Sequence, residues 1–565
     1  MRAVAGEPAL RYGGPIRTSP SIRPMQPRAW LPALLAAALS FAAGAQDNVR
    51  LPDMGSSAGA LLSPQEADAY GASMLHQMRA LNMVVDDPLL DAYINALGYR
   101  LVAASAEPKQ KFTFFVVKDN EINAFAAPGG YIGVNAGLIT TTADESELAS
   151  VIAHEIGHIT QNHLARAFEA SRKATPLMAL ALLGAILAGA HSNGDAPIGI
   201  LATGQGLLLQ QQINFTRADE AEADRVGIQT LARAGFDPEA MADFFGRMLA
   251  ALRPGGGEGD VPELLRTHPV TTSRISDAKA RAHVIEEQTH PGAPRLAAGD
   301  TRWEDQLIPL PYVHDRDSLL APRGGARPAA GASFYALMRE RVRVLAAGDP
   351  RALAVYYAQN LDRTPGFDTV ANRYGYALAL SRSDRGAKAA ETLRPLLQQD
   401  PDNLPLRLAM ADAEANAGRR DAALAQYADM AADSPDNPAI ALPYARALLA
   451  DGKPEPARKA AALLKPLLDD SEDPNLYSTY GRACDVAGDV DRAAEAYADA
   501  TYLSGHPEDA LAQLRRLAAK PSLDYYTRAR VDARIAELTP IVLELRRRGM
   551  RPDGDDQGRL TLRGG

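Results

Sequence analysis

The sequence predicts an α+β fold that is mostly helical, with a small sheet in the first half of the chain and an all-helical superhelix in the second. Residues 66–290 mix helical and strand-like patterns, whereas the sequence from about residue 331 is almost entirely helical in pattern and rich in Ala and Leu. At roughly 100–200 residues per domain, the 565 residues allow two to four domains. We therefore expect a mixed domain followed by a helical one.

The N-terminal residues are typical of a secretory signal peptide. After Met25 come the basic Arg28, an apolar run from Trp30 to Ala42 and the small residues Ala43-Gly44-Ala45, which is the order of the three regions of such a peptide. The apolar run is short for a membrane span, so a membrane anchor is the less favoured alternative. We expect residues 1–45 to be a leader that is cleaved after Ala45 and exports the protein.

The composition is that of an ordinary globular protein, with 46% hydrophobic and 23% charged residues. The formal net charge of −9 argues against a nucleic-acid partner, because a phosphate backbone needs a concentrated basic surface. Cys484 is the only cysteine, which excludes an intramolecular disulfide and a cysteine-rich zinc site. We expect its side chain to be a small buried hydrophobic group.

Three short segments before residue 140 have strand-like sequences. The segment from Phe112 to Val117 is aromatic and β-branched, which favours a strand. Two further short pieces flank Pro128-Gly129-Gly130, and this tripeptide is a turn signal. The sequence therefore predicts a strand followed by a β-hairpin.

A long amphipathic helix is predicted next. The run Thr142-Ala-Asp-Glu145 fits a capping box, in which the first and fourth side chains cap the helix N-terminus. Apolar residues then recur at helical spacing, namely Leu148, Val151, Ile152 and Ile159. We expect a helix from about Ala143 to Phe168, with the sequence His-Glu-Ile-Gly-His near its middle.

Two histidines of this run, His154 and His158, can bind one metal ion together. Because they are four residues apart, they lie one above the other on the same helical face. Zinc accepts such nitrogen ligands, and catalytic zinc sites have three protein ligands. Glu155 is displaced around the helix, where its carboxylate can act as the general base that takes a proton from the attacking water.

The alternative is a polar helix face with two surface histidines. The strongly apolar surroundings argue against this alternative, because buried polar side chains need partners. Gly157 argues against it as well, since a glycine inside a helix costs stability and suggests the close approach of another element.

The third ligand must come from outside this run. In the metzincin arrangement a glycine and a histidine follow the second histidine by three and six residues, but here those positions are Gln161 and Leu164. His163 is one residue short of the required position. We expect it on the surface or behind one of the ligands.

A later helix offers acidic candidates. Within the segment Arg217 to Arg225, Glu220 and Asp224 are four residues apart and share a helical face. Glu220 could bind zinc while Asp224 accepts a hydrogen bond from a liganding histidine and fixes its orientation. The alternative is a solvated acidic face, which is the interpretation we accept for Glu222.

The second half of the chain is internally repetitive. Pro401-Asp402-Asn403 recurs 34 residues later as Pro435-Asp436-Asn437, and Gly418 recurs at Gly452 with the same spacing and at Gly488 after 36 residues. This period predicts tetratricopeptide repeats, whose helix pairs stack into a superhelix. An unrelated helical bundle is the alternative, since no clean Trp stands at the first position of the motif.

The predicted repeats occupy residues 331–550. The preceding segment, residues 291–330, is rich in Pro, Gly, Arg and Asp and lacks a sustained period, so we interpret it as a linker or strap. We expect the last residues, 551–565, to form a disordered tail.

Three motifs together resemble the M48 family of gluzincin metallopeptidases. They are the run from His154 to His158, the later segment from Glu220 to Asp224, and the upstream segment from Asn123 to Gly130. The resemblance implies a metalloprotease domain over residues 46–290. It also implies that His154, His158 and Glu220 bind one zinc ion per chain and that Glu155 is the catalytic base.

The resemblance gives two further residues a role. Asp224 takes an acidic position of the family that is often described as a proton donor, and we favour for it the role of orienting a histidine. Thr267-His268-Pro269 matches a loop whose histidine can occupy the open position of the zinc ion and hold the enzyme inactive. His268 would then be a regulatory fourth ligand, whereas by sequence alone it would be a surface histidine.

Two segments concern substrate and membrane contacts. The family comparison suggests that the strand from Tyr131 to Asn135 offers an edge on which an extended substrate pairs. The apolar stretch from Pro176 to Ala190 is expected to be a buried core helix, with a mobile cover that touches a membrane or a partner as the alternative.

The signal peptide and the repeats resemble those of periplasmic members of the family. This likeness implies a periplasmic zinc endopeptidase that degrades misassembled outer-membrane proteins, assists their assembly as a chaperone and contacts the barrel-assembly machinery through its repeats. The alternative is a chaperone or adaptor without proteolytic activity, which would have no use for Glu155. A membrane-embedded peptidase is disfavoured, because long apolar segments are missing.

Overall fold

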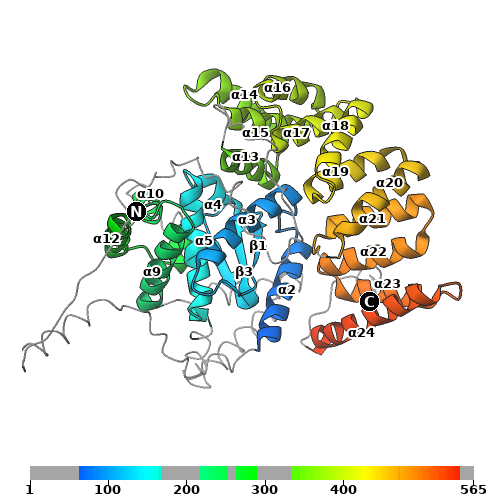
Figure 1. The fold of residues 1–565 in the computed structure, drawn as a ribbon, viewed down its shortest axis with the longest axis horizontal. Coiled ribbons are helices and arrows are strands. Elements are labelled where there is room, and N and C mark those ends of the chain that lie inside the picture. Colours follow the sequence, from blue (N-terminus) through cyan, green and yellow to red (C-terminus); the bar gives the residue numbers. More distant parts are fainter. Residues whose placement is uncertain are drawn as a thin grey trace, which may run out of the picture. The chain divides into compact units, whose positions relative to one another are not determined.

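A computed structural model describes most of the chain after residue 62 (Figure 1). The described residues are 63–164, 166, 216–251, 262–288, 333–469 and 471–547. The predictions for the leader, for the apolar stretch from Pro176 to Ala190, for the strap and for the tail lie outside these residues.

A three-stranded sheet forms the centre of the first domain. Its strands are β1 (Thr113–Val117), β2 (Ala124–Ala127) and β3 (Tyr131–Asn135), in the order β1-β3-β2. The helices of this domain are α2 (Pro64–Ala80), α3 (Pro88–Ala104), α4 (Ala136–Thr141), α5 (Glu145–Thr160), α9 (Arg217–Arg233), α10 (Ala240–Ala251), α11 (Glu263–Thr267) and α12 (Thr272–Gln288).

Strands β2 and β3 form the predicted hairpin, with Ala126 opposite Ile132. The turn consists of Pro128–Gly130, and Gly129 has a φ of 82°, in the left-handed region that favours glycine. Strand β3 also pairs in parallel with β1, so it is the central strand. The expectation that β3 offers an open edge is therefore wrong, and β2 is an edge of this sheet.

Side chains alternate between the two faces of the sheet along each strand. Helices cover both faces. On one face, side chains such as Phe114 and Ile132 belong to the main core together with residues of α3 and α5. On the other face, Phe115 and Tyr131 pack in a smaller cluster with Met78 of α2. Helix α5 thus lies directly on the sheet, which fixes the position of its histidines.

Helix α5 is shorter than predicted: it begins at Glu145 and ends at Thr160. Its N-cap is Asp144, whose side chain accepts a hydrogen bond from the backbone N–H of Glu147 at 3.0 Å. Thr142, the expected cap, instead bonds the backbone of α4 and lies 2.7 Å from the Tyr335 hydroxyl. The helix ends at Thr160 rather than Phe168, and Asn162 then has a φ of 55°.

Glycines allow α5 and α9 to pack closely. A Cβ atom on Gly157 would lie 3.1 Å from the carbonyl oxygen of Ala223, and one on Gly227 would lie 3.2 Å from the backbone nitrogen of His154. Either would be tight against neighbouring backbone. This confirms the expectation that Gly157 marks the approach of another element, and that element carries Glu220.

The second half of the described chain is helical throughout. Its α-helices are α13 (Phe334–Ala346), α14 (Pro350–Arg363), α15 (Val370–Ser381), α16 (Gly386–Gln399), α17 (Leu404–Asn416), α18 (Arg420–Asp433), α19 (Pro438–Leu448), α20 (Pro454–Leu464), α21 (Pro474–Ala487), α22 (Val490–Leu503), α23 (Pro507–Ala518) and α24 (Tyr525–Arg547). From α14 onward consecutive helices contact each other, α13 contacts α15, and α15, α17, α19 and α21 also contact in series. This is the arrangement expected of stacked helix pairs.

The repeated sequence markers lie at helix ends. Asn403 and Asn437 are the N-caps of α17 and α19. Gly418, Gly452 and Gly488 follow α-helices or their short 3-10 extensions and have φ between 62° and 91°. The 34-residue period therefore records a repeated pattern of helix starts and stops. Assignment of these pairs to the tetratricopeptide class stays a prediction.

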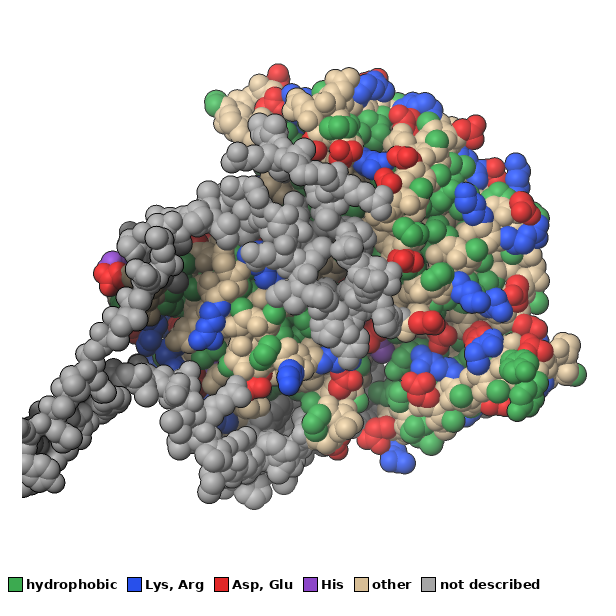
Figure 2. All heavy atoms as spheres, viewed as in Figure 1, with side chains coloured by type: hydrophobic (Ala, Val, Ile, Leu, Met, Phe, Trp, Pro, Cys, Tyr) green, Lys and Arg blue, Asp and Glu red, His purple; other side chains and the backbone are tan. Residues whose placement is uncertain are grey.

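The buried positions of the array are mostly apolar, and Cys484 of α21 is among them at 2% exposure, as predicted. On the face shown in Figure 2, acidic and basic side chains are interspersed over the array. Among the described residues, no helix combines the length and the apolar character needed to cross a membrane.

Candidate metal centre

The two histidines of α5 point at the same place. Their Nε2 atoms are 3.0 Å apart, and both side chains are almost completely buried. Two imidazoles one helical turn apart can share one ion in this way, as predicted from their spacing. Burial and the neighbouring His154 and His268 rings lower the pKa of His158, so its ring is neutral, which is the form that binds metals.

Helix α9 adds a carboxylate to this pair. Glu220 has one oxygen 3.5 Å from the Nε2 atom of His154 and the other 3.5 Å from that of His158. Burial would raise the pKa of Glu220, but the charges and hydrogen bonds of His268 and His154 outweigh burial and hold it far below its usual range. Glu220 is therefore ionised at neutral pH.

His268 completes the cluster from the other side. It is the residue after α11, and it is 5% exposed although it lies in a loop. Its Nδ1 atom is 2.9 Å from Glu220 Oε1 and 3.4 Å from His154 Nε2. The sequence alone predicted a surface histidine, but His268 is buried.

The donor set fits a transition metal such as zinc. One atom from each of His154, His158, Glu220 and His268 can be chosen so that all four lie within 4.8 Å of one another, and all four residues are buried. Two imidazoles and a carboxylate are a common set for catalytic zinc, with a further position left for water or another ligand. In this cluster, His268 is the fourth residue with a nitrogen within reach of the other three.

Glu155 faces the same cluster from the neighbouring position on α5. It is 1% exposed, and its Oε1 atom has no hydrogen-bond partner among the described residues. That oxygen lies 3.6 Å from His268 Nε2. Burial raises the pKa of Glu155, while the charges on His268 and His154 oppose the rise. A buried carboxylate oxygen that accepts no hydrogen bond from the described residues, next to a ligand cluster, is suited to accept one from a water molecule.

Asp224 contacts the outer side of His154. Its Oδ1 atom lies 3.0 Å from His154 Nδ1, the ring nitrogen that faces away from the cluster. Both oxygens of Asp224 also accept hydrogen bonds from Arg274 of α12 at 2.7 Å. Burial would raise the pKa of Asp224, but His154 and Arg274 outweigh it and lower the pKa. Asp224 is thus an ionised carboxylate that lies between the outer nitrogen of His154 and the guanidinium of Arg274.

Arg274 is the residue that the sequence analysis missed. Besides Asp224 it contacts Glu220, whose Oε2 atom is 2.8 Å from Arg274 Nη1. It neutralises two buried carboxylates that would otherwise be costly to bury. The sequence contains a signal for this role, because two buried carboxylates, Glu220 and Asp224, need a cation nearby. Arg274 is such a cation, six residues after His268.

His163 lies behind His158. The Nδ1 atoms of the two rings are 2.9 Å apart, and His163 Nε2 lies 3.2 Å from Glu222. Of the two expected places for His163, the structure supports the one behind a ligand, because its side chain is buried. Glu222 is only partly exposed, and it is not merely solvated as predicted, since it contacts Arg166 at 3.1 Å as well as His163.

Comparison with known proteins agrees with this geometry. The profile of peptidase family M48 matches residues 88–282, which include every residue of the cluster. The chain is 34% identical over 488 residues to the beta-barrel assembly-enhancing protease of Yersinia pestis, which covers 86% of this chain and 91% of that protein.

Two further relatives extend the comparison. The beta-barrel assembly-enhancing protease of Escherichia coli K12 is 32% identical over 492 residues, which cover 86% of this chain and 91% of that protein. The mitochondrial metalloendopeptidase OMA1 of Schizosaccharomyces pombe is 31% identical over 183 residues, which is 32% of this chain and 50% of that protein. The chain therefore belongs to peptidase family M48 and is a metallopeptidase that resembles the beta-barrel assembly-enhancing proteases over most of its length.

Proposed function

We propose that this protein is a zinc-dependent endopeptidase of the periplasm that degrades misassembled outer-membrane proteins and assists their assembly. The observation that carries the catalytic part is the convergence of two imidazoles and a carboxylate beside Glu155, all in the buried interior. The client class rests on the relatives, which are beta-barrel assembly-enhancing proteases.

One zinc ion would be held by His154, His158 and Glu220. When bound, zinc supplies a Lewis acid that polarises the peptide carbonyl and lowers the pKa of a water molecule. Glu155 then acts as the general base: its carboxylate takes a proton from the attacking water and passes it to the leaving amine nitrogen. The raised pKa of Glu155 suits both steps, since the carboxyl group must accept the proton and release it again.

Asp224 is a positioning residue in this scheme. It accepts from the outer nitrogen of His154, which leaves the other ring nitrogen free to bind metal. Because Arg274 holds both of its oxygens, Asp224 is poorly placed to act as a proton donor. This favours the orienting role over the proton-donor role that the family resemblance also offers.

His268 acts as a latch. Its ring contacts Glu220 and His154, and it lies beside Glu155, so in this conformation it takes the room in which a substrate carbonyl and the attacking water must meet. Proteolysis then requires the loop from Thr267 to Pro269 to move away. The resting enzyme is held inactive until this happens.

The substrate would approach along β2. This strand is an edge of the sheet, and the backbone N–H of its residue Ala126 donates a hydrogen bond to the carboxylate of Glu155. Extended chains that add to a strand are bound through their main chain with little demand on sequence. Such binding suits an enzyme whose clients are unfolded. In this proposal, the helical array contacts the clients and the barrel-assembly machinery.

The alternative is a chaperone or adaptor that works through its helical array alone. The array runs from α13 to α24, and this length favours chaperone or adaptor binding as an additional activity. The burial of Glu155 beside the cluster speaks against it as the only activity, because a purely structural metal site has no use for an additional buried carboxylate.

The test compares zinc content and casein cleavage in the wild type and in Glu155→Gln. We expect one zinc per chain in both proteins and loss of cleavage in the variant only. Equal cleavage by both proteins would refute the role of Glu155 as general base. Casein cleavage at the normal rate by zinc-free protein would refute the zinc dependence of the reaction.

A further inference from the structure

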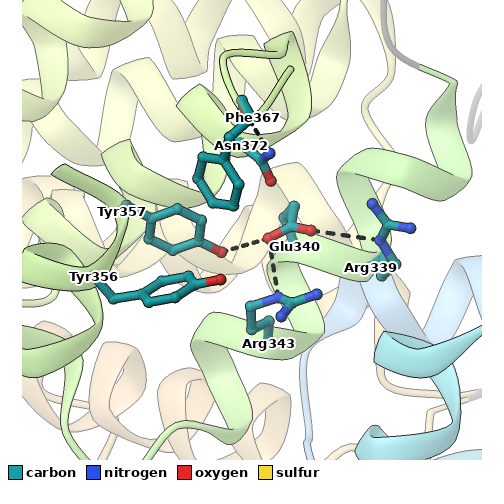
Figure 3. A pocket seen from close by; sticks show the side chains of 7 residues that line it. All are labelled: Arg339, Glu340, Arg343, Tyr356, Tyr357, Phe367 and Asn372. Atoms are coloured by element: carbon teal, nitrogen blue, oxygen red, sulfur yellow. Dashed lines mark hydrogen bonds and ion pairs between the residues drawn. The ribbon is translucent and has the colours of Figure 1, made fainter. Parts of the chain in front are cut away.

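A second site of polar and aromatic side chains lies far along the sequence from the metal centre, at the start of the helical array. It is a pocket of about 280 Å³ between α13, α14 and α15 (Figure 3). Its lining residues are Arg339, Glu340, Arg343, Tyr356, Tyr357, Phe367 and Asn372. None of them takes part in the proposed hydrolysis.

Glu340 forms the floor of this pocket. It is 1% exposed, and its carboxylate accepts a hydrogen bond of 2.5 Å from the hydroxyl of Tyr357. Gly375 of α15 leaves the room for this contact, since a Cβ atom there would lie 2.6 Å from the same hydroxyl. The floor is therefore built by residues of three helices.

Two arginines lie on either side of Glu340. The Nε atom of Arg343 is 3.1 Å from its carboxylate, and that of Arg339 is 3.4 Å away. Two guanidinium groups against one carboxylate leave a net positive charge. Within the described chain, no acceptor is recorded for the terminal nitrogens of either arginine, and the two side chains are 33% and 26% exposed. These nitrogens can therefore bind a second anion, and a carboxylate matches their planar geometry.

The opposite wall is aromatic. The rings of Tyr356 and Phe367 meet edge to face with their centroids 5.8 Å apart, and Tyr356 is 44% exposed. Exposed aromatic rings at the mouth of a small pocket are suited to bind an apolar side chain.

Asn372 adds a hydrogen-bond acceptor. Its Nδ2 atom donates to the carbonyl oxygen of Phe367 at 2.7 Å, which fixes the orientation of the amide. The Oδ1 atom then points into the pocket on the side of Glu340 (Figure 3). An amide oxygen in this position can accept a backbone N–H group.

We propose that this pocket binds the C-terminal residue of an unfolded polypeptide that ends in a large apolar side chain. The terminal carboxylate would bind the terminal nitrogens of Arg343, while Arg339, which also faces the Tyr335 ring, adds positive charge on the other side of Glu340. The backbone N–H of the terminal residue would donate to Asn372, and its side chain would lie against Tyr356. The ligand carboxylate neutralises the excess positive charge. A pocket slightly below the usual range of about 300–1,000 Å³ for small-molecule sites suits one residue.

The test is direct binding of labelled peptides to the full chain carrying Glu155→Gln, so that the peptides stay intact. The probes are fluorescein-labelled Gly-Ser-Gly-Ser-Phe with a free carboxylate and the same peptide with a C-terminal amide, followed by fluorescence anisotropy. We expect the acid to bind at least about tenfold more tightly than the amide, because charge-assisted hydrogen bonds are lost in the amide. Since no hydrolysis is measured, the result is independent of the proposed protease function.

Variants connect this preference to the pocket. Arg343→Gln should abolish the preference for the acid, whereas the matched control Arg351→Gln should keep it, because Arg351 is 75% exposed and pairs only with Asp384 in the described chain. Glu340→Gln should strengthen binding of the acid several-fold, since a competing carboxylate is removed while the arginines stay. A purely structural ion cluster would not show this gain.

Two results would overturn the proposal. One is equal affinity for the acid and the amide. The other is a preference for the acid that survives Arg343→Gln in a protein whose circular dichroism is unchanged. If that variant does not fold, Tyr356→Ala decides instead: its ring is partly exposed, and unchanged affinity for the acid would show that the peptide binds elsewhere.

Discussion

The substitution Asp224→Asn separates the two roles that can be assigned to this carboxylate. In the native chain one oxygen of Asp224 faces His154 at 3.0 Å, and both oxygens accept hydrogen bonds from Arg274 at 2.7 Å. Asparagine has nearly the same shape, but its amide nitrogen must take the place of one oxygen. That nitrogen would direct a donor at another donor, on Arg274 or on His154.

The expected loss is in metal affinity. Partners that orient a liganding histidine are typically worth about 10–100-fold in metal binding, which corresponds to roughly 1.4–2.7 kcal/mol. His158 and Glu220 remain in place, so the site should still fill at high zinc concentration. Cleavage at saturating zinc should then return to within a few-fold of the wild-type rate.

The assay is competition for zinc with a chromophoric chelator, followed by casein cleavage over a range of free zinc. Asp243→Asn is the matched control, because Asp243 is exposed on α10 and no contact of its side chain is recorded within the described chain. Unchanged zinc affinity together with lost cleavage at saturating zinc would refute the orienting role and favour a proton donor at this position.

Three further changes test other parts of the molecule. His268→Ala should raise casein cleavage by roughly tenfold, as expected if one charge-assisted contact of about 1.4 kcal/mol keeps the latch closed, and unchanged or lower cleavage would rule the latch out. Gly130→Ala should lower the free energy of unfolding in urea by more than Gly418→Ala: both glycines have positive φ, but only at Gly130 would a Cβ meet backbone, at 2.2 Å from the Lys111 carbonyl oxygen. Burial and the charges of Arg79 and Arg534 lower the pKa of His76 to about 3, so the unfolded chain takes up a proton below pH 6.5 that the folded chain does not. Stability is therefore lost as pH falls below 6.5, by at most about 2 kcal/mol at pH 5, and His76→Leu should lose less between these two pH values in urea unfolding; an equal loss would contradict this assignment.

Local sequence predicted the features that depend on a few neighbouring residues. The spacing of His154 and His158 fixed their common face, because helical geometry alone sets it. Pro128 with its two glycines predicted the hairpin turn, and the repeated Asn and Gly residues of the array lie at helix caps, where local backbone chemistry determines them. These are interactions within one element or one turn.

Features that depend on distant segments escaped the sequence analysis. The central position of β3 follows from its parallel pairing with β1, which no local pattern encodes. Thr142 fits a cap motif, but it is held by Tyr335, which is 193 residues away. The position of Arg274 between Glu220 and Asp224 likewise depends on how α12 packs against α9. In each case tertiary contact outweighed or supplemented the local signal.

The central claim is that His154, His158 and Glu220 hold one catalytic zinc ion. An anomalous difference map at the zinc absorption edge, from crystals of the full-length active enzyme, tests it most directly. We expect one peak per chain at about 2.0–2.2 Å from the Nε2 atoms of His154 and His158 and from a carboxylate oxygen of Glu220. A zinc peak elsewhere, or active enzyme without a peak at this position, would contradict it.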